Sequence, residues 1–207
     1  SFYWLYEMPR EEARDVIGVL RDLFTHGLLS SPEQHMALDA AGAVALTTDD
    51  EAFDREALNR LKQQAFLKAG TRCFNQKGFS GTSLDEIAEQ LQVSKGAFYY
   101  HFANKEALLT QCYDYTLDQL ERVVAGIEQV DAAPAAKLHP ACRQIFALQK
   151  SDQGPLVHFN SITALPPAVR QRLLARLAAV HATLETYVKQ AIADGQFRDI
   201  PAAIVVQ

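Results

Sequence analysis

The 207-residue sequence contains few of the residues that build disulfide or metal frameworks. Its three cysteines, Cys73, Cys112 and Cys142, are an odd number at wide spacing, which fits neither a set of disulfides nor a four-ligand zinc site. His139 and Cys142 share a helical face, but no second pair of ligands stands nearby and Pro140 lies between them. We therefore expect no metal site, no cofactor and a reducing, cytoplasmic location.

Long hydrophobic runs are also absent. The longest runs, such as residues 202–206, are far shorter than the roughly 20 residues needed to cross a bilayer. The first twelve residues lack the basic start, apolar middle and cleavage site of a secretion signal. Neither a Gly-x-Ser-x-Gly elbow nor a Gly-rich phosphate loop occurs, so no residue set indicates an enzyme. We expect a protein without a membrane span and without catalytic residues.

The sequence contains instead a series of helical patterns, in which apolar residues recur at intervals of three and four. No alternating strand pattern with turn signals accompanies them, so the predicted fold class is all-α. A break is expected over 131–140, which carries Pro134 and Pro140. The expected helices are residues 11–25, 55–77, 83–90, 95–101, 105–127, 141–150 and 168–195, with a further helix starting near residue 201.

Two short predicted helices flank a three-residue turn at 91–93, which is the arrangement of a helix-turn-helix motif. Ser83 and Glu86 have the spacing of a capping box at the start of the first helix. Ser94 is the expected N-cap of the second helix, and Asn104 the N-cap of the long helix that follows. In motifs of this kind the second helix enters the major groove of DNA.

The second short helix divides its aromatic residues between two faces. At about 100° per residue, Phe98 and Phe102 fall together and are expected in the core, whereas Tyr99 and Tyr100 fall outside beside Lys95. Exposed tyrosines next to a lysine suit contact with DNA phosphate and entry into a groove. Further candidates for phosphate contact lie at the far end of this helix and at the start of the preceding one, and they are His101, Lys105, Thr82 and Ser83.

The charge distribution is uneven along the chain. The net charge is -5, but residues 55–109 carry eight Lys or Arg against five acids, a balance of +3, while the remaining residues sum to -8. A mildly basic module joined to an acidic one is consistent with a nucleic-acid partner, although a balance of +3 is also within ordinary surface variation.

Residues 74–109, "FNQKGFSGTSLDEIAEQLQVSKGAFYYHFANKEALL", resemble the DNA-binding segment of the TetR family of bacterial transcriptional regulators. The resemblance implies a three-helix helix-turn-helix DNA-binding domain followed by an α-helical effector and dimerisation domain. It places base contacts on Ser94, Lys95, Gly96 and Ala97. It places phosphate contacts on Thr82, Ser83, Tyr99, Tyr100, His101 and Lys105. Lys95 is the side chain most able to read a guanine edge.

The resemblance also implies the domain boundaries and the partners. Residues 55–106 would be the DNA-binding domain and 107–207 the ligand-binding and dimerisation domain, apparently incomplete at its C-terminus. Residues 1–30 resemble the final helices of such a unit, and 31–54 would be a linker, so the chain could be part of a tandem two-unit protein. The alternative is an N-terminal extension of a single unit. The expected partners are double-stranded operator DNA, a small-molecule effector of unknown identity, and a second copy or a tandem pseudo-dimer partner.

The predicted function is therefore a ligand-responsive transcriptional regulator, most simply a repressor that an effector releases from its operator. Two histidines in the predicted effector domain, His158 and His181, could touch a ligand, although packed or surface roles are commoner for this residue. The competing prediction is a TetR-like interaction module that has kept the fold but does not bind an operator.

Overall fold

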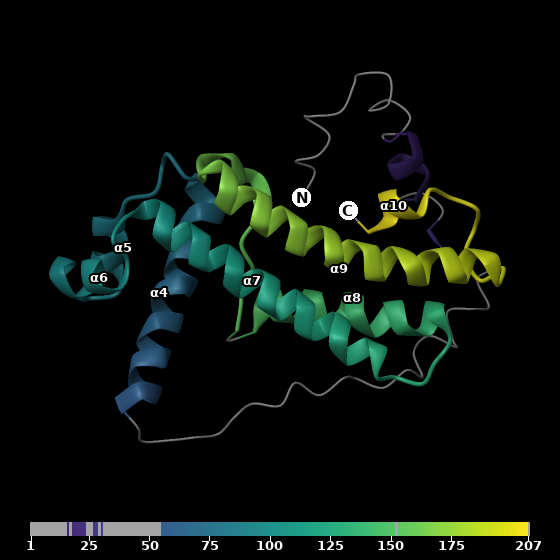
Figure 1. Ribbon diagram of the computed structural model, residues 1–207, viewed down its shortest axis with the longest axis horizontal. Coiled ribbons are helices and arrows are strands. Elements are labelled where there is room, and N and C mark those ends of the chain that lie inside the picture. Colours follow the sequence, from purple (N-terminus) through teal and green to yellow (C-terminus); the bar gives the residue numbers. More distant parts are fainter. Residues whose placement is uncertain are drawn as a thin grey trace. The chain divides into compact units, whose positions relative to one another are not determined.

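The computed structural model describes residues 16, 18–23, 27, 28, 30, 55–151 and 153–206. These residues form helices and no β-strand, which confirms the all-α prediction (Figure 1). No helix within the described ranges is long and apolar enough to span a membrane. The helices are α4 (Arg55–Lys77), α5 (Leu84–Gln90), α6 (Lys95–His101), α7 (Lys105–Glu128), α8 (Pro134–Lys150), the 3-10 helix η2 (Phe159–Ala164), α9 (Pro167–Ala193) and α10 (Ala202–Val205).

Most predicted helix ends agree with the structure to within one or two residues, and glycine accounts for two of them. Gly78 and Gly195 follow α4 and α9 closely and both have φ of +69°, a conformation that only glycine adopts without strain. Of the helix expected over 11–25, residues 16 and 18–23 are helical, and the other positions lie outside the described residues.

The break expected over 131–140 is wrong in its second half, because α8 begins at Pro134 and continues through Pro140. Proline is tolerated in the first turn of a helix, where its missing N–H has no helical partner to lose. Pro140 lies inside the helix, where it lacks the N–H for a backbone hydrogen bond and its ring crowds the carbonyl of the preceding turn, yet the helix continues past it. The two prolines therefore mark a helix start and an interior position, and neither marks a break before residue 141.

The chain divides into two compact units. The α4–α6 unit comprises the described residues of 55–119 and 147–174, and the α10 unit comprises 120–146, 175–206 and the described positions of 16–30. Helices α7, α8 and α9 each contribute residues to both units. The predicted domain boundaries at 30, 54 and 106 remain predictions.

The core of the α4–α6 unit is aromatic. Phe74, Phe98 and Phe102 are almost completely buried, together with Ile87 and Leu108. Helix α5 contacts both α4 and α6, and these three helices pack around this core. Burying a Phe or Ile side chain stabilises a fold by about 1.5–3 kcal/mol, so these residues hold the unit together.

Residues 156–158 are bound to two helices of the same unit. The Asn75 side chain, from α4, donates to the Leu156 carbonyl at 2.9 Å and accepts from the His158 N–H at 2.8 Å. From α7, the Thr116 hydroxyl accepts from the N–H of residue 157 at 2.9 Å, and the Tyr113 hydroxyl donates to the His158 carbonyl at 3.2 Å. This extended segment thereby connects the last turns of α4 to the middle of α7.

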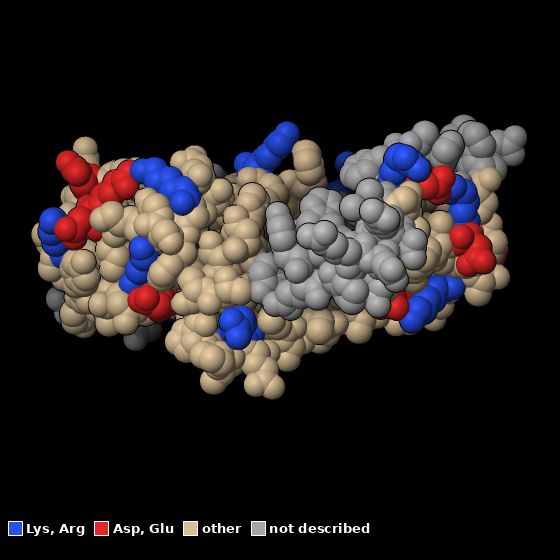
Figure 2. Space-filling model, turned by 90° about the horizontal axis from the view of Figure 1, so that it is seen from above, with Lys and Arg blue, Asp and Glu red and all other residues tan. Residues whose placement is uncertain are grey.

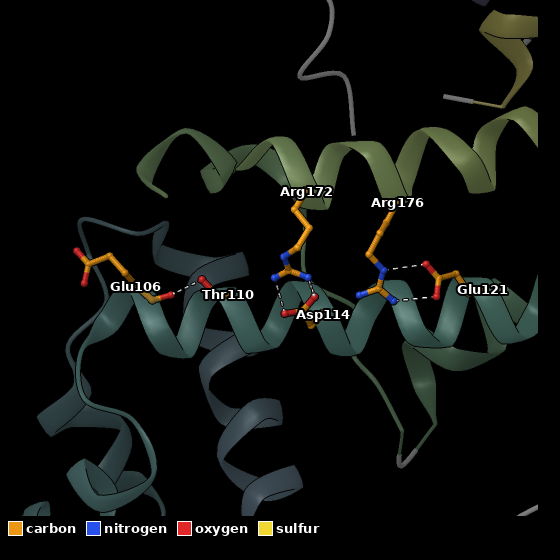
Figure 3. Close-up of polar contacts among 6 residues, drawn as sticks. All are labelled: Glu106, Thr110, Asp114, Glu121, Arg172 and Arg176. Atoms are coloured by element: carbon orange, nitrogen blue, oxygen red, sulfur yellow. Dashed lines mark hydrogen bonds and ion pairs between the residues drawn. The ribbon is translucent and has the colours of Figure 1, made fainter. Parts of the chain in front are cut away.

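Arginines on α9 form bidentate ion pairs with carboxylates on α7, one within each unit (Figure 3). In the α4–α6 unit, Arg172 donates to both oxygens of Asp114 at 2.6 and 2.9 Å. In the α10 unit, Arg176 donates to both oxygens of Glu121 at 2.9 and 2.8 Å. A guanidinium that meets a carboxylate through two parallel bonds fixes geometry better than a single contact does. The pairs therefore set the register of α7 against α9 inside each unit.

The α10 unit has its own small core. Its buried residues are Ala135, Leu138, Val188, Ala191, Phe197 and Ala202, and Leu28 packs against them. Arg198 donates to the Gly27 carbonyl at 2.7 Å and pairs with Asp22 at 2.9 Å, while its backbone N–H donates to the Leu28 carbonyl at 3.1 Å. The described positions of 16–30 thus pack on the chain that follows α9.

Candidate nucleic-acid interface

The turn between α5 and α6 is built from backbone hydrogen bonds rather than from a glycine. Gln92 adopts a positive φ of 55°, and the N–H of Val93 donates to the Ala88 carbonyl at 3.0 Å. Positive φ is uncommon for a residue other than glycine, and here the flanking bonds hold it. The short turn predicted at 91–93 is present, and it brings the starts of α5 and α6 to the same side of the unit.

Both predicted serines stand at the N-cap positions, but only the serine of α6 makes a side-chain cap bond. Ser94 is the N-cap of α6, and its hydroxyl oxygen accepts from the Ala97 N–H at 3.2 Å. Ser83 is the N-cap of α5 but makes no side-chain cap hydrogen bond, so the capping box predicted with Glu86 is wrong. Glu86 pairs instead with Lys77 of α4. An ion pair to a neighbouring helix has replaced the local bond that the spacing predicts.

Helix α6 is fixed to α4 through one ring that the sequence did not pair with it. Phe66 is buried and contacts Phe98 edge to face, with ring centroids 5.1 Å apart. The same ring lies 6.0 Å from Phe102 and 5.2 Å from His101. Aromatic pairs at these distances stabilise a core beyond their buried area. Phe66 belonged to the apolar face predicted for 55–77, but a periodic pattern does not show which helix that face meets.

The predicted division of the aromatic residues is confirmed. Phe98 and Phe102 are fully buried, while Tyr99 is 46% exposed and Tyr100 is 87% exposed. A Cβ atom built at Gly96 would meet nothing within 4 Å, so this position leaves the helix surface open to a partner. The exposed members of the predicted DNA-contact set are Ser83, Ser94, Lys95, Gly96, Ala97, Tyr99 and Tyr100. Ser83 precedes α5, and the others are Ser94, which caps α6, and exposed positions of α6 itself.

Three members of the predicted set are less accessible than the rest. Thr82 is buried, and its hydroxyl donates to the Gly78 carbonyl at 2.7 Å. Lys105 is half-buried; its ammonium donates to the Thr82 carbonyl at 3.0 Å and lies 4.4 Å from the centre of the Phe79 ring. His101 is half-buried against Phe66. Their contact with phosphate stays a prediction, and in this structure Lys105 also fixes the loop between α4 and α5.

One residue of this surface was missed by the sequence reasoning. Asp85, in the first turn of α5, accepts from the Lys95 ammonium at 2.5 Å and from the Tyr99 hydroxyl at 3.5 Å. The hydrogen bond that Lys95 donates to Asp85, together with the attraction of that carboxylate, raises the pKa of Lys95. No linear pattern relates residue 85 to residue 95, because only the turn between the helices brings them together.

Charged side chains of both signs are interspersed on the surface shown in Figure 2, without a continuous block of one colour among the described residues. The lysines near α5 and α6 follow the same rule, since Lys77 pairs with Glu86 and Lys95 with Asp85. Within the described ranges, no group of three or more His, Cys, Asp or Glu side chains could hold a metal ion. Lys77 and Lys95 are therefore each paired with a carboxylate of α5.

A short second helix that buries its aromatic residues against α4 and exposes a lysine and two tyrosines defines a helix-turn-helix protein. Residues 66–112 match the model of bacterial regulatory proteins of the tetR family. Over 68 residues, which are 33% of this chain, the sequence is 40% identical to the HTH-type transcriptional regulator YerO of Bacillus subtilis (strain 168). The helix-turn-helix segment of this chain is therefore of the kind found in the TetR family of bacterial transcriptional regulators.

The matched part is short relative to the relatives. The chain spans 24% of YerO and between 24% and 31% of the first curated relatives that it matches. Solved structures extend the likeness to most of the chain at the level of the fold. AibR in complex with isovaleryl coenzyme A and operator DNA is similar over 70% of this chain and 80% of its own, with a TM-score of 0.60 and 25% identity. The ketosteroid transcriptional regulator KstR2 of Mycobacterium tuberculosis is similar over 79% of both chains, with a TM-score of 0.60 and 20% identity.

Proposed function

We propose that this chain is a DNA-binding transcriptional regulator, most simply a repressor, that reads operator DNA with α6 and responds to a small-molecule effector. The observation that carries the proposal is the division of α6. Phe98 and Phe102 fix the helix to Phe66, while Lys95, Tyr99 and Tyr100 are left on the outer face. A rigid helix with exposed hydrogen-bond donors satisfies the geometric requirement for reading a major groove.

The proposed contacts divide into two kinds. Ser94, Lys95, Gly96 and Ala97 lie in the first turn of α6, the part of a recognition helix that reaches base edges. A lysine that contacts guanine O6 and N7 contributes about 1–3 kcal/mol of discrimination against other bases. The positions proposed for phosphate contact flank this turn, and they are Thr82, Ser83, Tyr99, Tyr100, His101 and Lys105. Phosphate contacts position the protein without carrying sequence information.

The effector is proposed to bind the helical part of the chain that follows α6. Support comes from AibR, a similar fold whose structure contains isovaleryl coenzyme A. A buried acceptor also lies on α7: Gln119 is 3% exposed, and its side-chain oxygen has no hydrogen-bond partner among the described residues. An unpaired buried acceptor is costly, and a donor from a ligand or a water would satisfy it. A thermal-shift screen of small acids and thioesters on the wild type and on Gln119→Leu tests this assignment.

DNA geometry supports a second recognition helix, supplied by a dimer or by a tandem unit. Two recognition helices must lie about 34–36 Å apart to enter successive major grooves, so one copy of α6 is not enough for an operator of two half-sites. A second copy of the chain, or a second unit of a tandem protein, would supply the other helix. Residues 1–30 are proposed to act as the closing helices of such a unit, supported by the packing of Gly27 and Leu28 on Arg198.

The experiment that tests the proposal is selection of binding sites from random DNA duplexes, followed by anisotropy titration of the selected duplex and a shuffled control. We expect saturable binding, a preference for the selected duplex and a fall in affinity as salt rises. Tyr100→Ala should weaken binding to both duplexes without lowering the melting temperature, because the side chain is exposed. Absence of saturable, sequence-preferring binding would instead favour an interaction module that has kept the fold.

A further inference from the structure

The carboxylate of Asp85 engages two of the proposed DNA-contacting donors of α6, Lys95 and Tyr99. Lys95 and Tyr99 lie one helical turn apart on the outer face of α6, and Asp85 reaches them from the first turn of α5. The Lys95 ammonium is 2.5 Å from one carboxylate oxygen, and the Tyr99 hydroxyl is 3.5 Å from the other. The side chain assigned to base reading is therefore occupied by an acid of its own chain before any DNA arrives.

This contact is weak enough for DNA to replace it. The Lys95 side chain is 67% exposed and the Asp85 side chain is 46% exposed, so solvent screens their attraction. An exposed pair of this kind changes an equilibrium by at most about fivefold. A lysine contact to guanine changes it by roughly fivefold to 150-fold, so base contact outweighs the intramolecular pair. Lys95 can leave Asp85 when an operator is present, at a cost in affinity.

We propose that Asp85 is an intramolecular competitor of DNA for Lys95, and that it sets the affinity of the helix-turn-helix surface below the value its donors would give alone. The inference rests on the proposed function. Asp85 itself contacts no base in this scheme and acts through Lys95, so it is a positioning residue. The DNA phosphate and the guanine edge both accept hydrogen bonds from the Lys95 ammonium. They therefore compete with the Asp85 carboxylate for this one group.

The competition affects affinity and salt dependence rather than sequence preference. Lys95 must leave Asp85 to reach either a phosphate or a base, so the same cost applies to an operator and to any other duplex. Rising salt screens the Lys95–Asp85 attraction, so the cost of leaving Asp85 is largest at low salt and shrinks as salt rises. Affinity for DNA should therefore fall less steeply with salt than it would for a free lysine. These two effects distinguish competition from a loss of base reading.

The matched variants are Asp85→Asn and Glu86→Gln. Each removes one negative charge from α5, but Glu86 pairs with Lys77, which is not among the proposed DNA contacts. Anisotropy titrations over a salt series, on a selected and on a shuffled duplex, compare them with the wild type. We expect Asp85→Asn to bind both duplexes up to about fivefold more tightly at low salt, with a steeper fall in affinity as salt rises. Glu86→Gln should change affinity by less than about twofold, as expected for a charge screened over a Debye length.

A double-mutant cycle shows whether the effect runs through Lys95. In a Lys95→Met background, Asp85→Asn should no longer increase affinity or salt slope, because the competing ammonium is gone. Circular dichroism and melting temperature should be unchanged in all variants, since the side chains are exposed. Equal gains from Asp85→Asn and Glu86→Gln, or a gain that persists without Lys95, would overturn the competitor assignment while leaving the proposed function intact. Failure of the wild type and of every variant to bind DNA saturably would overturn the proposed function, and this inference with it.

Discussion

Replacing the two serine N-caps of the helix-turn-helix motif should have unequal effects on stability. Ser94 accepts a hydrogen bond from the Ala97 N–H at 3.2 Å, whereas Ser83 makes no side-chain cap bond. Sequence spacing alone predicts a side-chain cap at both positions, with Glu86 completing a capping box at Ser83. The structure shows the cap bond at Ser94 only. Ser94→Ala should therefore destabilise the protein, and Ser83→Ala should leave it close to the wild type.

The magnitude follows from the length of α6 and from its exposure. Loss of a serine N-cap lowers the free energy of unfolding by about 0.5–2 kcal/mol. For the exposed cap bond of Ser94, at 3.2 Å, we expect a loss of about 1 kcal/mol. For a chain of this length, 1 kcal/mol lowers the melting temperature by roughly 2–4 °C. Because α6 has only seven residues, the loss should also open it locally and raise amide hydrogen exchange there by about fivefold. Ser83→Ala should remain within about 0.5 kcal/mol of the wild type, as ordinary surface substitutions do.

Thermal unfolding followed by circular dichroism, together with hydrogen exchange resolved to residues 95–101, measures both effects without DNA. Ser94→Gly provides a third variant, because glycine is an acceptable N-cap and should cost only a few tenths of a kcal/mol relative to serine. Equal losses at Ser83 and Ser94, or a larger loss at Ser83, would refute the reasoning from the observed cap bond. A loss at Ser94 without faster exchange in α6 would show that the bond contributes elsewhere.

Three further predictions use the same surface and its supports. Lys95→Ala should cost about 1–3 kcal/mol of binding free energy on the preferred operator and relax the sequence preference. Lys105→Ala should weaken binding to all duplexes and lower the salt slope by about one. Equal losses on every DNA for both variants would refute this division. Asn75→Ala should destabilise the protein by about 1–3 kcal/mol, since it leaves the Leu156 carbonyl and the His158 N–H without their partner. Asn75→Asp keeps the acceptor for the His158 N–H and should cost less; denaturant titration measures both. Burial raises the pKa of the Cys112 thiol from 9.0 to about 12, so the folded chain keeps a proton that the unfolded chain loses. The free energy of unfolding should therefore fall as pH rises above about 9. Cys112→Ala should flatten this part of the stability profile, and an unchanged profile would contradict the assignment.

Periodicity, N-cap residues and glycine stops predicted most of the helices of this fold. Helix α4 begins and ends where the sequence indicates, and Gly78 has the positive φ that its position demands. The positions of Phe98 and Tyr100 on opposite faces of α6 were also predictable, since a helical wheel needs only the period of the helix. Proline was misleading at residues 134 and 140. The sequence does not show whether a proline ends a helix, starts one or lies inside one, and here Pro134 starts α8 and Pro140 lies inside it.

Contacts between helices could not be predicted in the same way. Phe66 meets α6 and Asp85 meets Lys95 only because the turn at Gln92 sets the angle between successive helices. Glu86 shows the same limit, since its spacing from Ser83 favours a local bond, yet the nearby Lys77 ammonium is the stronger partner. A charged group can choose a partner on another helix over a neutral one nearby, and sequence spacing does not show that choice.

The position of α6 depends on both helices that flank it. On one side Phe66 holds Phe98 and Phe102 against α4, and on the other side Asn104 caps α7 directly behind α6, with its side-chain oxygen 2.8 Å from the Ala107 nitrogen. Residues 156–158 then bind α4 through Asn75 and α7 through Thr116, so these two helices cannot separate without breaking buried or half-buried hydrogen bonds. A ligand shifts a conformational equilibrium only through contacts that differ between the two states. An effector that changes how α6 meets DNA must therefore alter contacts of this kind, which α4 and α7 carry.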